Sequence, residues 1–280
     1  MIGVGGKPPK EFQEYLIERE NAKAMVSHGD YQLSPASAFL RYTVEAKDAI
    51  KSCIRQFPKN MDGKYTKASI DSLQHLIVAT LPAIMGHFET YQRYLFAGMF
   101  DYSVYLKNLD IKKFVEALNK ACGDRLDLDL VRLAAHRGLG VSSIGVLVAD
   151  CLPGWQNPRQ VNGYFNAFGM KKDLFSQSDC QKIFVLLQLR HSIVHTGGTI
   201  TLADAQKVPA LAEYADRNIT FGNNFIYEVS RKMHQMIKRA TSNIGDAYVA
   251  RLVDDIPVAK KASIEKLFEV KSSIHVWLKP

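Results

Sequence analysis

The 280-residue sequence is poor in cysteine, and its four cysteines stand far apart. They are Cys53, Cys122, Cys151 and Cys180, and no two of them form a C-x-x-C pair. Zinc knuckles require closely spaced ligand pairs, and disulfide-stabilised small domains require a denser cysteine framework. We therefore expect free, buried thiols in a reducing compartment and no metal site.

The sequence also has little that would carry the chain into a membrane. The most apolar window, residues 138–152, contains Asp150 and is shorter than the ~20 apolar residues needed to span a bilayer. Residues 1–9 show no basic stretch followed by an apolar run, which is the pattern of a secretory signal. These features predict a soluble, cytoplasmic protein with no membrane partner.

Nucleotide-binding patterns are missing as well. Strand-rich segments do not alternate with helices in βαβ order, which argues against a Rossmann or P-loop fold. Gly5-Gly6-Lys7 does not form a Walker motif, because the first glycine of that pattern would fall on Met1. We expect no cofactor.

A positive charge balance is present. Lys and Arg total 36 against 28 Asp and Glu, so the formal net charge is +8. A basic protein favours polyanionic partners such as RNA, because bound Lys and Arg displace condensed counterions. Many basic proteins bind no nucleic acid, so the charge is consistent with an RNA partner without identifying one.

Residues that begin and end helices recur along the whole chain. Capping residues followed by apolar periodicity predict helices that begin after a cap and end near a glycine or proline. The predicted starts are Ser34 (with Pro35 at the first helical position), Thr66, Asp110, Ser143, Asn157, one of Ser176, Ser178 or Asp179, and Asn224. The predicted ends include Phe57, Ala121, Leu152, Gly169 and His195.

Two long apolar stripes mark the main helices. The first has spacings of three and four and comprises Ile70, Leu73, Ile77, Leu81, Ile84, Phe88, Tyr91 and Leu95, with Pro82 expected to kink the helix. The second comprises Ile226, Val229, Met233, Met236, Ala240, Ile244 and Ala247, with Arg231, Lys232, Lys238 and Arg239 on other faces. These basic residues either hold RNA or a partner or form a solvated face.

The sequence thus predicts an all-α fold with a helical bundle over residues 65–252. A helical N-terminal extension, residues 1–64, and a C-terminal tail, residues 253–280, flank it. Residues 199–202 and 218–221 are β-like and predict at most a small hairpin after the helix that ends at His195.

The segment 183–195 carries the most conspicuous motif. On a helix, one apolar face would hold Ile183, Leu186, Leu187, Ile193 and Val194, with Arg190 in the middle of it. A guanidinium on an apolar face is costly unless it meets an anion. His191 and His195 lie one turn apart, and Thr196-Gly197-Gly198 ends the helix where a ligand has access.

Arg190-His191-Ser192-Ile193-Val194-His195 resembles the R-x4-6-H motif of the HEPN superfamily. The apolar run 184–189 before it, the glycines after it and the long helix from Asn224 resemble the layout of the RiboL-PSP-type branch. The resemblance covers roughly residues 72–247. It implies a helical bundle that dimerises with the motif helices face to face, and RNA cleavage without a metal ion that leaves a 2′,3′-cyclic phosphate.

That resemblance makes a homodimeric endoribonuclease of a toxin–antitoxin or phage-defence system the leading hypothesis, with an antitoxin or other regulatory protein as a further partner. In it, His195 is general base or acid and Arg190 stabilises the phosphate. His191 stands where the family more often has asparagine, and either orients RNA or shares proton transfer. Arg190 and His195 lie about 140° apart on one ideal helix, so two copies are expected to interleave.

Structural interpretations of the same residues remain open. Arg190 could form an ion pair across the bundle with Glu89 or Asp173, and His195 could simply complement the helix dipole. Glu89 is a further candidate beside the cleft, but it also fits a solvated position.

Two other patterns only partly match known motifs, one for a zinc site and one for a second R-x4-6-H motif. His191 and His195 have zinc-pair spacing but lack the glutamate of H-E-x-x-H. The segment Arg132–His136 is one residue too short for a second motif, and we interpret it as a surface helix end.

Two alternative functions follow from these structural interpretations. One is a non-catalytic HEPN module that binds RNA or a partner protein. The other is a purely structural helical protein.

Overall fold

The computed structural model describes residues 26–123 and 143–272, and their fold is all-α, as predicted. The α-helices are α1 (His28–Leu33), α2 (Pro35–Arg55), α3 (Lys67–Asp101), α4 (Ile111–Ala121), α6 (Ile144–Cys151), α7 (Pro158–Asn166), α8 (Gln177–His195), α9 (Leu202–Lys207), α10 (Phe225–Val249) and α11 (Val258–Leu267). Short 3₁₀ turns span Ser103–Tyr105 and Pro209–Tyr214. Strands β1 (Thr199–Ile200) and β2 (Arg217–Asn218) pair antiparallel, so the small hairpin-like sheet is also present, with α9 and a 3₁₀ turn inside its connection.

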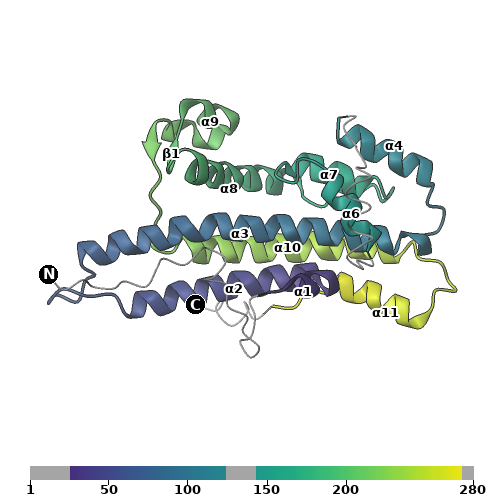
Figure 1. Ribbon diagram of the computed structural model, residues 1–280, viewed down its shortest axis with the longest axis horizontal. Coiled ribbons are helices and arrows are strands. Elements are labelled where there is room, and N and C mark those ends of the chain that lie inside the picture. The colour runs from purple at the N-terminus through teal and green to yellow at the C-terminus, as the bar shows by residue number, and fades with distance from the viewer. Residues whose placement is uncertain (1–25, 124–142, 273–280) are drawn as a thin grey trace, which may run out of the picture.

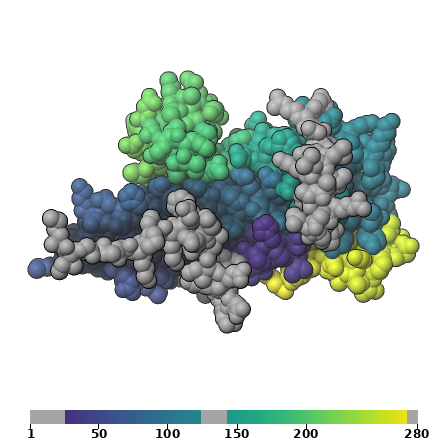
Figure 2. Space-filling model, in the orientation of Figure 1, coloured from purple at the N-terminus to yellow at the C-terminus, as the bar shows by residue number. Residues whose placement is uncertain are grey.

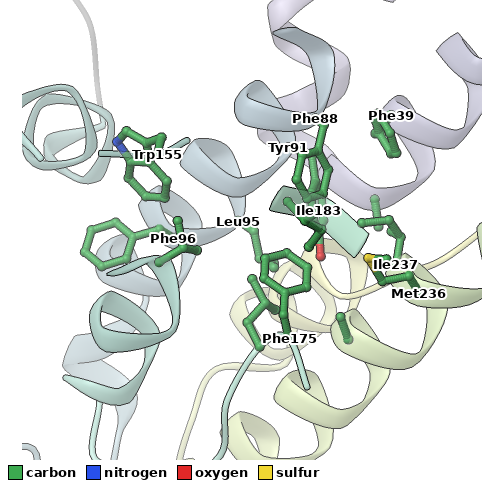
Figure 3. Close-up of a cluster of buried hydrophobic side chains, with 14 of the residues drawn as sticks. Phe39, Phe88, Tyr91, Leu95, Phe96, Trp155, Phe175, Ile183, Met236 and Ile237 are labelled. Atoms are coloured by element: carbon green, nitrogen blue, oxygen red, sulfur yellow. The ribbon is translucent and has the colours of Figure 1, made fainter. Parts of the chain in front are cut away.

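Helix α3 is the axis of the molecule (Figure 1). Helices α2 and α10 run along one side of it, while α6, α7 and α8 lie against the other side. Aromatic rings join these layers: Phe88 of α3 lies 5.7 Å from Phe39 of α2 and 5.7 Å from Phe175 before α8. Figure 3 shows this cluster, with Ile183 of α8 and Met236 of α10 closing it. The motif helix is therefore fixed to the centre of the core.

The predicted stripe of α3 is buried along nearly all of its length, from Leu73 to Leu95. Ile70 is an error of the prediction, because its side chain is 44% exposed. Ser69 faces inward there instead, and its hydroxyl donates to the carbonyl of Pro58. The helix is continuous through Pro82.

Helix α3 is also long and apolar enough to cross a bilayer, judged by length and composition. Its apolar stripe, however, is buried against α2, α6 and α8. That is how the core helix of a soluble protein is placed.

Helices begin where the sequence predicts at five positions. In each case a cap side chain accepts a backbone N–H of the first turn, and the caps are Thr66, Asp110, Ser143, Asn157 and Ser176. Two predicted starts lack such a bond: Asn224 before α10 makes none, and Ser34, which precedes Pro35 of α2, makes none either. The Ser34 hydroxyl donates instead to the carbonyl of Glu269, after α11, and so ties the two ends of the described chain together.

Both flanking segments contribute to the core. Phe39 and Leu40 of α2, within the predicted N-terminal extension, are fully buried against the bundle. The predicted C-terminal tail contains α11, which packs against α1, α3 and α10 and buries Ile264 and Leu267. Leu267 lies so close to Gly98 that a Cβ there would meet it at 2.4 Å.

The cysteines are free, as expected, but not all are buried. Cys122 and Cys180 are buried, while Cys151 is half-buried and Cys53 is exposed on α2. The expectation of buried thiols is therefore wrong for Cys53, which lies near the solvent-exposed C-terminal end of α2.

Candidate functional site

Helix α8 positions the motif, and its start is fixed by two interactions. The Ser176 hydroxyl accepts the backbone N–H of Asp179, a first-turn acid that suits the positive end of the helix dipole. The Asp179 carboxylate, almost fully buried, accepts both 2.6 and 2.7 Å hydrogen bonds from Arg239 of α10. Burial raises the pKa of Asp179, but hydrogen bonds from Ser176 and Arg239 outweigh it and lower the pKa below its usual range.

The apolar face of α8 differs from the predicted one at its C-terminal end. Ile183 and Leu187 are buried as expected, and Leu189 is buried although the pattern did not include it. Val194 was expected on the buried face, but it is 49% exposed. The end of the motif therefore lies at the surface.

Two glycines terminate α8 and expose His195. Gly197 and Gly198 have φ of 62° and 86°, the left-handed region that residues with a Cβ rarely adopt. The Gly198 N–H returns to the carbonyl of Ser192 at 3.0 Å, and the chain then turns into β1. His195 is consequently an exposed side chain at an accessible helix end.

The two motif histidines lie side by side, and a carboxylate lies beside one of them. The rings of His191 and His195 are 4.7 Å apart between centroids. His191 Nε2 lies 3.9 Å from Oδ1 of Asp204, which belongs to α9 and is almost fully buried, while 45% of the His191 side chain is exposed. Figure 2 shows this region, residues 199–221, as a green knob on the body of the molecule.

Asp204 is held firmly where it meets His191. Its backbone N–H is capped by Thr201, and its carboxylate accepts from Lys207 at 3.0 Å. Burial raises the pKa of Asp204, but Lys207, Thr201 and His191 outweigh burial and lower the pKa. Sequence reasoning missed Asp204, because it lies thirteen positions beyond the motif's first histidine in a different helix.

Arg190 faces the opposite neighbour, α3. It is half-buried, and its Nε is buried without a hydrogen-bond partner. Glu89, a residue of α3, attracts the Arg190 guanidinium electrostatically. Oε1 of Glu89 is likewise buried without a hydrogen bond. Burial raises the pKa of Glu89, and the positive charges of Arg190 and Arg93 offset part of that rise.

The candidate residues therefore form two groups. Arg190 and Glu89 lie together at the α3 side, whereas His191 and His195 lie together beside α9. Asp173, the other suggested partner of Arg190, instead accepts a 2.7 Å hydrogen bond from Asn166. Within one chain the arginine and the terminal histidine face different neighbours, in line with their separation on an ideal helix.

The basic residues of α10 have different environments. Arg239 is bound to Asp179, and Arg231 is bound to Glu228 at 2.6 Å. Lys232 and Lys238 are exposed. The segment 132–136 lies outside the described residues, so its expected surface position is untested.

The comparisons with known proteins add no relative. No protein-family profile matches the chain. No curated protein and no solved structure matches it significantly. The motif resemblance and the geometry of the site are therefore the grounds for a functional argument.

Proposed function

We propose that this protein is a metal-independent endoribonuclease of the HEPN type, acting in the cytoplasm as a homodimeric toxin or phage-defence effector. The observation that carries the proposal is the end of α8. There, two histidines stand 4.7 Å apart at an accessible helix end, directly after a half-buried arginine whose Nε has no hydrogen-bond partner. A buried unpaired donor is costly, and a phosphate oxygen is a partner that would satisfy it.

The proposed reaction needs one base, one acid and one fixed cation. A neutral imidazole takes the proton from the ribose 2′-OH, and the 2′-oxygen attacks phosphorus while the bond from phosphorus to the 5′-oxygen breaks. An imidazolium gives its proton to the departing 5′-oxygen. The products are a 2′,3′-cyclic phosphate and a 5′-hydroxyl, so protons and charge balance. Arg190 stabilises the charge that develops on the phosphorane.

Asp204 offers a reason for two histidines to take different roles. The Asp204 carboxylate lies 3.9 Å from Nε2 of His191. A carboxylate at that distance suits a ring that carries positive charge during the reaction. His191 then serves as the acid and the exposed His195 as the base, and Asp204 acts as a positioning residue.

A homodimer would bring the two groups of residues together. Arg190 lies toward α3 and His195 lies at the exposed helix end, so one chain does not present both to a single phosphate. A second motif helix, packed antiparallel on the first, would place its arginine beside the first chain's histidines.

The second candidate is a non-catalytic HEPN module that binds RNA, an antitoxin or another regulatory protein. The attraction between Arg190 and Glu89 favours it, because a guanidinium held by its own chain is less free to bind phosphate. The interpretation of the chain as a purely structural helical protein draws on the same attraction.

Cleavage in the presence of EDTA distinguishes these candidates. Labelled tRNA and mRNA are incubated with wild type, His195→Ala and the matched control His75→Ala, an exposed histidine of α3. The proposal expects cleavage by wild type and control, with cyclic-phosphate ends, and none by His195→Ala. If all three proteins bind RNA without cutting it, the non-catalytic module is favoured. If none of them binds or cuts RNA, a purely structural protein is favoured.

A further inference from the structure

An apolar groove runs between the motif helix α8 and α10, which lie antiparallel against α3 (Figure 1). The ion pair between Asp179 and Arg239 joins the two helices at one end. Past that pair, a hollow of about 270 Å³ opens between Val185 and Leu186 on α8 and Met233 on α10. The first hollow of the groove therefore lies on the C-terminal side of Asp179 along α8.

The groove continues along α8 toward the 199–221 region. A second hollow of about 510 Å³ shares Val185 and Leu189 with the first, and is closed on its far side by Leu211 and Tyr214. Tyr214 is 51% exposed, so an apolar ring there faces solvent. The two hollows adjoin at Val185 and Leu189, one turn apart on α8, so a helix laid along α8 would contact both.

The rim of the groove is positively charged. Lys182 of α8, Lys232 of α10 and Arg217 of β2 line it, and all three are exposed. The acidic residue in its lining, Glu228, is already bound to Arg231 at 2.6 Å. The groove therefore combines an apolar floor with a rim that carries three basic side chains and one acidic side chain.

We propose that this groove binds an acidic amphipathic helix of a partner protein. Apolar residues at i, i+3, i+4 and i+7 of such a helix would fill the floor, and carboxylates on its flanks would meet the lysines and Arg217. RNA fits less well, because its phosphates could bind the basic rim but would leave the largely apolar floor between α8 and α10 unfilled. A second copy of this chain fits less well in the groove itself, because the same groove on that copy carries the same basic rim.

One wall of the groove belongs to the region that also carries part of the candidate site, but binding in the groove does not depend on catalysis at that site. Ile200 and Leu211 belong to the region that also carries Asp204, which contacts His191. A bound helix would therefore lie next to the motif histidines. The binding itself stands whether or not the protein cleaves RNA.

The test is a selection from a displayed library of helical peptides on the wild-type protein, with counter-selection on Lys182→Glu/Lys232→Glu. We expect the enriched peptides to carry one apolar stripe flanked by Asp or Glu. Measured by fluorescence anisotropy, the best peptide should bind the double variant about tenfold more weakly. A version with Lys in place of its acidic residues should recover binding to that variant.

The control variant Lys260→Glu/Lys261→Glu changes the net charge equally, on exposed positions of α11 far along the chain. It should bind the selected peptide as wild type does. Three results would overturn the proposal: no enrichment over the counter-selection, enriched peptides without an acidic amphipathic pattern, or equal loss of binding in both double variants. A change of oligomeric state in Lys182→Glu/Lys232→Glu alone would assign the groove to a second copy and overturn it too.

Discussion

Replacing Asp204 with asparagine should slow RNA cleavage without removing it. The substitution keeps the shape of the side chain and removes the charge that lies 3.9 Å from His191. Opposite unit charges at that distance attract by about 1 kcal/mol in water and about 4 kcal/mol at an effective dielectric constant of 20. Because 45% of the His191 side chain is exposed, the lower figure applies. A loss of about 1 kcal/mol corresponds to a roughly fivefold lower rate.

The loss should appear in kcat rather than in KM, because Asp204 acts on His191 and does not touch RNA in the proposed mechanism. Asp216→Asn is the matched control. It removes the same charge from an exposed residue in the same connection, and its φ of 56° is one that asparagine tolerates. Equal activity of Asp204→Asn and wild type, with the variant folded by circular dichroism, would refute the assignment of roles to the two histidines.

Three further predictions concern the framework of the site. Arg239→Ala removes the counter-charge of the buried Asp179 carboxylate and leaves it the hydrogen bond from Ser176, so it should lower the free energy of unfolding in urea by about 1–2 kcal/mol at neutral pH, the exposed arginine reducing the effect. Gly145→Ala would place a Cβ 2.1 Å from the carbonyl oxygen of Ala97, so we expect a loss of about 2–3 kcal/mol in the same assay. Because burial raises the pKa of Glu89, its ionisation opposes folding, and Glu89→Gln should gain stability relative to wild type as the pH rises above about 4.5.

Each of these three has a clear contrary result. An unchanged urea midpoint for Arg239→Ala would mean that the buried aspartate finds other partners. Wild-type stability of Gly145→Ala would contradict the close approach of α6 to α3. A stability difference between Glu89→Gln and wild type that does not change with pH would contradict the raised pKa of that carboxyl.

Local chemistry explains which parts of the fold were predictable. Side chains such as Thr66, Asp110 and Ser176 cap the helix that follows them, so the sequence alone indicates where these helices begin. Periodicity located the stripe of α3 but not its limit, because burial at Ile70 depends on which neighbours reach that turn. The same reason explains Val194 at the end of α8.

Long-range contacts account for what the sequence did not reveal. Helix α11 was missed because its burial rests on few residues, such as Ile264 and Leu267, that show no long stripe. Glu89 was named as a candidate, and its approach to Arg190 needed the packing of α8 on α3 to be known. Asp204 carries no motif, and only the turn at the two glycines after α8 brings it to His191.

The most direct test of the central claim mixes two inactive variants. The proposed site takes its arginine from one chain and its histidines from the other, so Arg190→Ala and His195→Ala should each fail to cleave RNA. After subunit exchange of an equimolar mixture, half of the dimers are mixed and each mixed dimer has one intact site. The account predicts recovery of about a quarter of the wild-type cleavage rate in EDTA. A mixture that stays inactive while the wild type cleaves would contradict the shared site, and a wild type that does not cleave would contradict the ribonuclease itself.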